Sequence, residues 1–473
     1  MFFYVKGGYD LGHTPTILAK FEDFLKQNNL TLAQFAEHSG VHQRTLNNWI
    51  AKHRPVAIHQ LDRITLAMRL PEGFFYELYI DNYIIERSPD WRRIEPLLFR
   101  CAELDKLHAI QLVVAHIMDN LLYSPKLFDA AEKLFAQGQH NAALLLYEGI
   151  AEGEKYQHSE RLAICQYRLF TIHVGDDQMR NLKAATRFEP FVERLDEIDQ
   201  LDALKDLANV YRSLHEWDML YETAQKMRYK AEICYSMKQR QKKQKSEESY
   251  MRLSRPMFVY ITYADLLCAS VCEAQGNYQQ ALQFTYAYAD LDWVIETDEE
   301  TRHWINLFEH WAVGNVFVNK LLSGDTSVLP DYVEYIVATS ITNEDEKLSK
   351  LLNIIIAANR YAIDVDDVLS RFEVEFNSFD PASTDMYTHQ VVPEHITLFK
   401  YELAKYYLNR GSYSHGFKYL LDILSKSLTI NKEAFFIRCI RLFEQFKTFA
   451  DVKAHVKYES LVSEGQRERS FYY

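Results

Sequence analysis

Residues 31–49, TLAQFAEHSGVHQRTLNNW, carry the signals for two short helices separated by a glycine. Thr31 is a suitable N-cap, and Gln34 completes a capping box, so the pattern predicts a helix that begins at Leu32. Gly40 can adopt the positive φ at which such a helix ends. The apolar residues of the second helix form one face and are expected to be buried: Val41, Leu46, Trp49 and Ile50.

The polar residues of the second helix fall between these apolar positions and are expected to point outward: His42, Gln43, Arg44, Thr45, Asn47, Asn48 and Lys52. This arrangement is typical of a helix-turn-helix, whose second helix carries base-reading side chains on its exposed N-terminal part. We therefore predict that these residues bind double-stranded DNA. The alternative is a helical pair that only packs a core, but the cap, the glycine and the polar set all favour DNA binding.

The flanking segments extend this pair into a small helical domain. Thr14 and Pro15 are expected to open a preceding helix, and another helix follows Pro55 and closes near Gly73. The whole resembles the Cro/repressor type of domain, often called Xre-like. We expect a DNA-binding domain over 1–80 and a linker over 81–95.

Composition indicates that the rest of the chain is also helical. Only 15 Gly and 11 Pro occur in 473 residues, which is too few turn formers for an all-β fold. The formal net charge is −13, but residues 1–80 are close to neutral, which favours a sequence-specific regulator over a general nucleic-acid coat. No secretion signal and no run of 18 apolar residues is seen, and six cysteines lack a CxxC pair, so we expect a cytoplasmic protein with reduced thiols and no membrane partner.

Beyond residue 90 one helical hairpin pattern recurs, with a small residue at the turn and an aromatic or His two places later. It occurs at Gly138-His140-Ala143-Tyr147, Gly276-Tyr278-Ala281 and Gly411-Tyr413-Gly416-Leu420, and more weakly at His215-Trp217-Leu220-Ala224. The three glycines are spaced by about four periods of ~34 residues, which is the period of tetratricopeptide repeats. The sequence thus predicts an all-α fold with a tetratricopeptide-type α-solenoid over 96–460, irregular near the basic run 238–245, and a tail over 461–473.

Units stacked in this way form a concave face that can hold an extended peptide, whose backbone needs side chains that both donate and accept hydrogen bonds. Asn is such a side chain, and several Asn lie in the middle of helices, where intrinsic propensity does not favour them. The candidates for peptide binding, with one neighbouring Arg, are Asn209, Arg212, Asn315, Asn319, Asn353 and Asn359.

Catalytic signatures are missing. The sequence contains no HExxH, GxxxxGK[ST], GxGxxG or GxSxG motif, and its histidines have no metal-ligand spacing. The cluster Asp364, Asp366 and Asp367 is better explained as the cap and first turn of a helix than as a metal site. We therefore expect no enzyme activity, no cofactor and no metal.

An Xre-like helix-turn-helix followed by a long tetratricopeptide body resembles the RRNPP family of quorum-sensing receptors, either as an orphan member or in the manner of the phage arbitrium receptors. The resemblance implies a homodimeric transcription factor in which Gln43, Arg44, Thr45, Asn47 and Asn48 read DNA and the mid-helix Asn residues hold a short signalling peptide. We expect the dimer contact within 395–460, through Phe435, Phe436, Phe443 and Phe446. The alternative is a tetratricopeptide adaptor that binds and inhibits a partner protein, as Rap-type members do, with DNA binding secondary.

Overall fold

The computed structural model describes residues 16–86, 88–240, 253–339, 344–373, 386–429 and 433–470. Over these ranges the chain consists of helices and turns without a β-strand, so the predicted all-α fold with helical repeats is confirmed. The helices form two compact units. The first contains the residues up to His173 together with Pro190–Leu195, and the second contains Val174–Glu189 and the residues from Asp196 onward.

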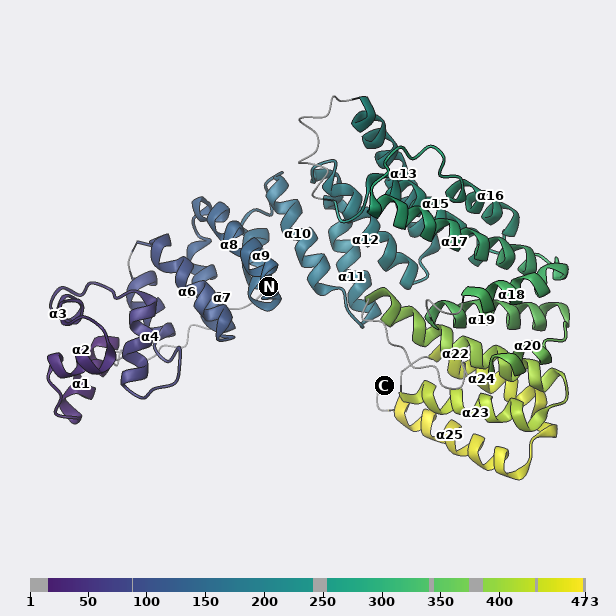
Figure 1. The fold of residues 1–473 in the computed structure, drawn as a ribbon. Helices are drawn as coiled ribbons and strands as arrows, with labels where there is room; N and C mark the ends of the chain where they lie inside the picture. Colours follow the sequence, from purple (N-terminus) through teal and green to yellow (C-terminus); the bar gives the residue numbers. More distant parts are fainter. Residues whose placement is uncertain are drawn as a thin grey trace. The chain divides into compact units, whose positions relative to one another are not determined.

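The first unit begins with α1 (Ile17–Gln27), α2 (Leu32–Ser39), α3 (Gln43–Lys52), α4 (Ile58–Ala67), α5 (Tyr76–Ile80) and the π-helix η1 (Asp81–Ile85). It continues with α6 (Trp91–Glu103), α7 (Leu107–Ile117), the 3-10 turn η2 (Leu121–Tyr123), α8 (Ser124–Ala136), α9 (His140–Gly153) and α10 (Glu160–His173) (Figure 1). One hydrophobic core runs through the unit, from Ile17 in α1 to Leu169 in α10.

The second unit contains α11 (Gln178–Phe188), α12 (Asp199–Ser213), α13 (Trp217–Arg240), α15 (Met257–Ala274), α16 (Tyr278–Ala289), α17 (Glu299–Leu322) and α18 (Leu329–Thr339). It ends with α19 (Glu344–Tyr361), α20 (Asp366–Arg371), α22 (Met386–Asn409), α23 (Tyr413–Thr429), α24 (Glu433–Phe446) and α25 (Val452–Ser470). Short 3-10 turns cover Thr326–Val328 and Lys447–Phe449, and a third, Glu189–Arg194, falls mostly in the first unit. Consecutive helices pack as hairpins, and α22 contacts both α19 and the much earlier α12.

The predicted hairpin turns are confirmed at all four positions. Gly138, Gly276 and Gly411 have φ values of +75°, +75° and +79°, and His215 adopts +59° at the equivalent place. They join α8 to α9, α15 to α16, α22 to α23 and α12 to α13. A left-handed residue ends the first helix of each pair and lets the second fold back on it.

The small residue inside the last of these hairpins permits close helix packing. A Cβ at Gly416 of α23 would lie 2.5 Å from Leu408 Cγ and 3.1 Å from the Ala404 carbonyl oxygen, both on α22. The pattern that predicted the hairpin therefore also marks the point at which its two helices meet.

Helix α15 is the one helix among the described residues that has the length and apolar composition to cross a membrane. Its mean hydropathy over Met257–Ala274 is 1.4, but 78% of this span is buried. It contacts α13 and α16, as expected for the core helix of a repeat.

Several predicted boundaries differ from the structure. The cap of α1 is Thr16, whose hydroxyl accepts the Ala19 N–H at 3.2 Å, whereas the predicted Thr14 and Pro15 lie outside the described residues. The start of the predicted linker, 81–85, is the helix η1, in which Tyr83 is buried. Residues 461–470 of the predicted tail continue α25, and Leu461 packs in the last core. The basic run is described only up to Arg240.

Of the four phenylalanines predicted to form a dimer contact, three are buried and Phe446 is half-buried. Phe435, Phe436 and Phe443 are at most 6% accessible, because α24 packs against α23 and also faces α25. The ring of Phe443 stacks on Tyr458 with a centroid distance of 3.8 Å. The expected exposure of Phe435, Phe436 and Phe443 is therefore wrong, since they are buried within the last repeats.

Candidate nucleic-acid interface

The turn between α2 and α3 has the geometry that the local sequence signals predict. The Thr31 hydroxyl accepts the Gln34 N–H at 3.3 Å, and the Thr31 N–H donates to Gln34 Oε1 at 2.9 Å. Gly40 ends α2 at a φ of +65°, where a side chain would strain the backbone. Arg63 of α4 donates to the Gly40 carbonyl oxygen at 3.3 Å and ties the turn to the domain.

One face of α3 is fixed to the core. Leu46 and Trp49 are fully buried, and the Trp49 ring lies 5.2 Å from the ring of Phe21 in α1. The Trp49 indole N–H donates to the Tyr83 hydroxyl at 2.8 Å in a buried hydrogen bond. The π-helix that follows α5 therefore holds the orientation of α3.

Tyr83 was missed by the sequence prediction, although a signal for it is present. Tyr76, Tyr79 and Tyr83 recur at helical spacing, and this periodicity continues past residue 80, the predicted end of the domain. All three rings are at most 5% exposed. A helical segment with that pattern belongs to a core and not to a linker.

The opposite face of α3 presents the predicted polar side chains to solvent. His42, Gln43, Arg44, Asn47 and Lys52 are exposed, whereas Thr45 and Asn48 are half-buried. His42 is the N-cap of α3, and its Nδ1 accepts the Arg44 N–H at 3.1 Å, so only Nε2 of this ring can contact a base. Gln43, Arg44 and Asn47 make no side-chain hydrogen bond or ion pair with the described residues.

The segment that contains α3 lacks acidic residues, which suits an interface with DNA. No Asp or Glu occurs between Glu37 and Asp62, a stretch that includes all of α3 together with Arg44, Lys52 and Arg54. The chain as a whole carries a net charge of −13. The region around α3 is therefore locally basic within an acidic chain, which suits a phosphate contact of modest strength.

A polar cluster connects the helix-turn-helix domain to α6. Asp62 of α4 accepts hydrogen bonds from the Tyr76 hydroxyl at 2.6 Å and from Arg100 Nε at 3.1 Å. Arg100 of α6 also pairs with Glu103 at 2.7 Å. Burial, together with the hydrogen bond to Asp62, raises the pKa of Tyr76 far above its usual value, so it stays a neutral donor. Helices α4, α5 and α6 thus form one body.

The predicted peptide-binding residues lie in the second unit, where Asn209, Asn315, Asn319 and Asn359 form hydrogen bonds with other helices. Asn209 accepts from the Tyr263 hydroxyl at 2.6 Å, and Asn315 donates to the Tyr288 hydroxyl at 2.7 Å. Asn353 interacts electrostatically with the buried Tyr332. The structure does not gather them into one open site.

The last two predicted amides, Asn319 and Asn359, also bond to side chains of other helices. Asn359 donates to the backbone oxygen and to Oε2 of Glu402 in α22, both at 2.8 Å. Asn319 donates to Glu273 Oε1 at 2.6 Å. Burial raises the pKa of Glu273 to about 7, although the hydrogen bond from Asn319 and the charge of Arg212 act to lower it. These contacts pack one repeat against the next.

The prediction that Asn319 contacts a surface-bound peptide does not fit the structure. Its side chain is fully buried, so no surface ligand can reach it in this arrangement. Its Oδ1 has no hydrogen bond. Asn315 lies one turn before Asn319 on α17, and Asn319 Nδ2 donates to the Asn315 carbonyl oxygen at 2.9 Å.

The acidic cluster serves as a cap. Asp364 Oδ1 accepts the Asp366 N–H at 3.0 Å, and Arg410 pairs with Asp364. The Tyr406 hydroxyl donates to Asp366 at 2.8 Å. Over the described ranges, no group of three or more His, Cys, Asp or Glu side chains is arranged to hold a metal ion.

Comparison with known proteins identifies the N-terminal domain. Residues 21–75 match the family model described as helix-turn-helix, which spans α2, α3 and α4. No curated protein matches the chain. A solved structure described as a circular tandem repeat protein with novel repeat topology and enhanced subunit contact surfaces is 12% identical and covers 95% of this chain and 98% of its own. Its TM-score of 0.17 is too low to support any conclusion about this chain.

Proposed function

We propose that this chain is a sequence-specific DNA-binding regulator in which α3 enters the major groove. The observation that carries the proposal is the contrast between the two faces of α3. Leu46 and Trp49 are fully buried on one face, while Gln43, Arg44 and Asn47 are exposed on the other without an internal partner. Together with the left-handed turn at Gly40 and the match of residues 21–75 to the helix-turn-helix family, this contrast favours a base-reading face.

The chemistry of these side chains suits base edges. The Arg44 guanidinium can donate two parallel hydrogen bonds to guanine O6 and N7, and the amides of Gln43 and Asn47 can pair with adenine N6 and N7. Lys52 at the C-terminal end of α3 is placed for a phosphate contact, which adds affinity without specificity. Thr45 and Asn48 are half-buried and contribute at the edge of the interface.

Selection from a pool of random duplexes tests this function. The wild-type chain should enrich one short motif, and the variant Gln43→Ala/Arg44→Ala/Asn47→Ala should enrich none while keeping its helical circular dichroism. Arg92→Ala is the matched control, because Arg92 is an exposed arginine on α6 outside the helix-turn-helix. If the wild type enriches no motif, the adaptor alternative replaces this proposal.

Control by a short peptide and a homodimeric state are finer parts of the proposal, and both come from the family resemblance. The supporting feature is that amides recur on α12, α17 and α19, three helices of the second unit. Because these amides are bonded inside the unit, a peptide would have to replace those bonds and so change how the hairpins pack. Peptide-display selection on the full chain, repeated with Asn359→Ala, tests this part. Light scattering at micromolar protein tests the dimer, and a monomer mass would exclude it.

A further inference from the structure

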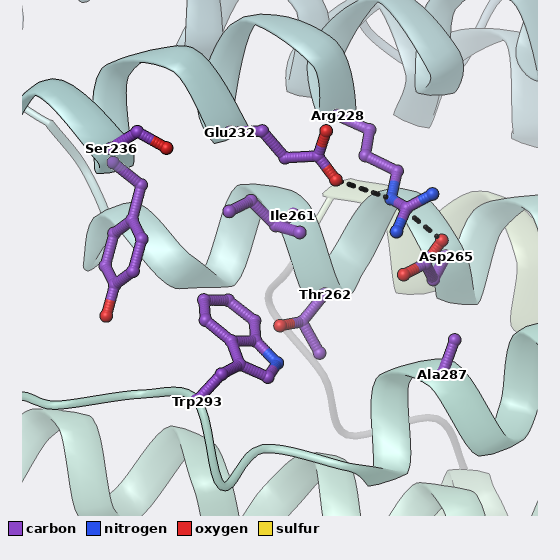
Figure 2. Close-up of a pocket in the computed structure, with 9 residues that line it drawn as sticks. Arg228, Glu232, Ser236, Ile261, Thr262, Asp265, Ala287 and Trp293 are labelled. Atoms are coloured by element: carbon purple, nitrogen blue, oxygen red, sulfur yellow. Dashed lines mark ion pairs between the residues drawn. The ribbon is translucent and has the colours of Figure 1, made fainter.

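A cavity of about 260 Å³ lies in the second unit between α13, α15 and the segment that follows α16. Figure 2 shows Arg228 and Glu232 entering from α13, Asp265 facing them from α15, and the Trp293 ring closing another side. The cavity is smaller than the roughly 300–1,000 Å³ of sites for drug-sized ligands. It is not formed by the amides discussed above or by the helix-turn-helix.

The polar groups of the cavity leave one negative charge uncompensated. Arg228 Nε lies 3.3 Å from Asp265 Oδ1 and 3.4 Å from Glu232 Oε1, so one guanidinium is shared by two carboxylates. The nearby Lys238 pairs with Glu296 at 2.9 Å, and the Tyr235 hydroxyl donates to the same carboxylate at 2.7 Å. No further cation among the described residues pairs with Asp265.

Asp265 is also short of hydrogen-bond donors. Its side chain is only 5% exposed, and Oδ1 makes no hydrogen bond, because the contact with Arg228 Nε lacks hydrogen-bond geometry. Burial raises the pKa of Asp265 to about 6, against the opposing effect of Arg228. At neutral pH this is an ionised, buried carboxylate whose desolvation is not fully offset.

We infer that this cavity binds a small organic cation, a primary ammonium or guanidinium group on a short apolar chain. Such a group brings the missing positive charge and N–H donors for Asp265. The side chains of Ile261 and Trp293 line the remaining wall, where an alkyl chain can pack and the indole can face the cation. The ligand would bridge α13 and α15 and stabilise that pair of helices in proportion to its concentration.

Calorimetry on the full-length chain tests the inference, with n-butylguanidinium as the probe and n-butylurea as a neutral molecule of nearly the same shape. At pH 8 and constant ionic strength the cation should bind with saturation and the urea should not. Asp265→Asn should weaken binding at least tenfold. Glu334→Gln is the control, since this carboxylate lies on α18 with a 69% exposed side chain and should leave binding unchanged.

The pH dependence of the wild type provides a readout that needs no variant. Lowering the pH from 8 to 5 should weaken binding roughly tenfold, because protonation with a pKa near 6 removes the Asp265 charge. Binding through ordinary surface carboxylates would persist at pH 5. The inference would be overturned by equal binding of the urea or by wild-type affinity in Asp265→Asn. It would also be overturned by displacement of the probe by Mg²⁺ at the same ionic strength, or by no saturable binding at millimolar probe.

Discussion

Removing the hydroxyl of Tyr83 should destabilise α3 without changing the sequence of that helix. The hydrogen bond from Trp49 Nε1 to this hydroxyl is 2.8 Å long, and the two residues are 0% and 5% exposed. In Tyr83→Phe the ring keeps its packing against Tyr79, at a centroid distance of 5.1 Å, so the cavity cost is small. The indole N–H is left buried without an acceptor, which costs about 1–3 kcal/mol.

Hydrogen exchange resolved by segment is the suitable assay, because the two units need not unfold together. Amide exchange in α3 should become about 5- to 150-fold faster. This factor is the loss of about 1–3 kcal/mol converted to a change in the equilibrium between the closed and the open helix. Tyr156→Phe is the control, since Tyr156 is 92% exposed and should leave α3 unchanged. Unchanged protection of α3 in Tyr83→Phe would refute the view that the π-helix after α5 supports this helix.

Two further predictions concern packing and charge in the repeats. Gly416→Ala should destabilise the second unit by about 1–3 kcal/mol in urea unfolding, because the new Cβ would lie 2.5 Å from Leu408 Cγ. A change below about 0.5 kcal/mol would argue against this close approach. Burial alone would raise the pKa of Glu132, but hydrogen bonds from Arg168 and Tyr147 hold it below the usual value. Glu132→Gln should therefore destabilise the first unit at pH 7. The difference in stability from wild type should shrink once the pH falls below about 4.3, the ordinary pKa of Glu, and vanish below the lower pKa of Glu132 in the folded state. A difference that persists at pH 2 would contradict this linkage.

The features that the sequence predicted correctly are those encoded within a few residues. The Thr31 capping box, the left-handed Gly40 and the hairpin turns at Gly138 and Gly276 each depend on local backbone chemistry. Such signals are independent of what packs on the other side of a helix. They sufficed to predict the helix-turn-helix and the repeat hairpins.

The features that were missed depend on partners distant in the sequence. Tyr83 acquires its role from Trp49, 34 residues earlier, and Asn359 is bonded by Glu402, 43 residues later. The burial of Phe443 depends on α25, whose Tyr458 covers it. A helical pattern shows that a residue is apolar or polar on one face, but it does not show which other helix covers that face.

Binding of Arg44→Ala to two kinds of DNA tests the central claim most directly. Affinity would be measured at one fixed salt concentration for the selected duplex and for a random duplex of equal length, with Arg92→Ala as the control. We predict that Arg44→Ala loses about 1–3 kcal/mol, or about 5- to 150-fold, on the selected duplex and little on the random one. Equal losses on both duplexes, or no loss on either, would contradict base reading by α3.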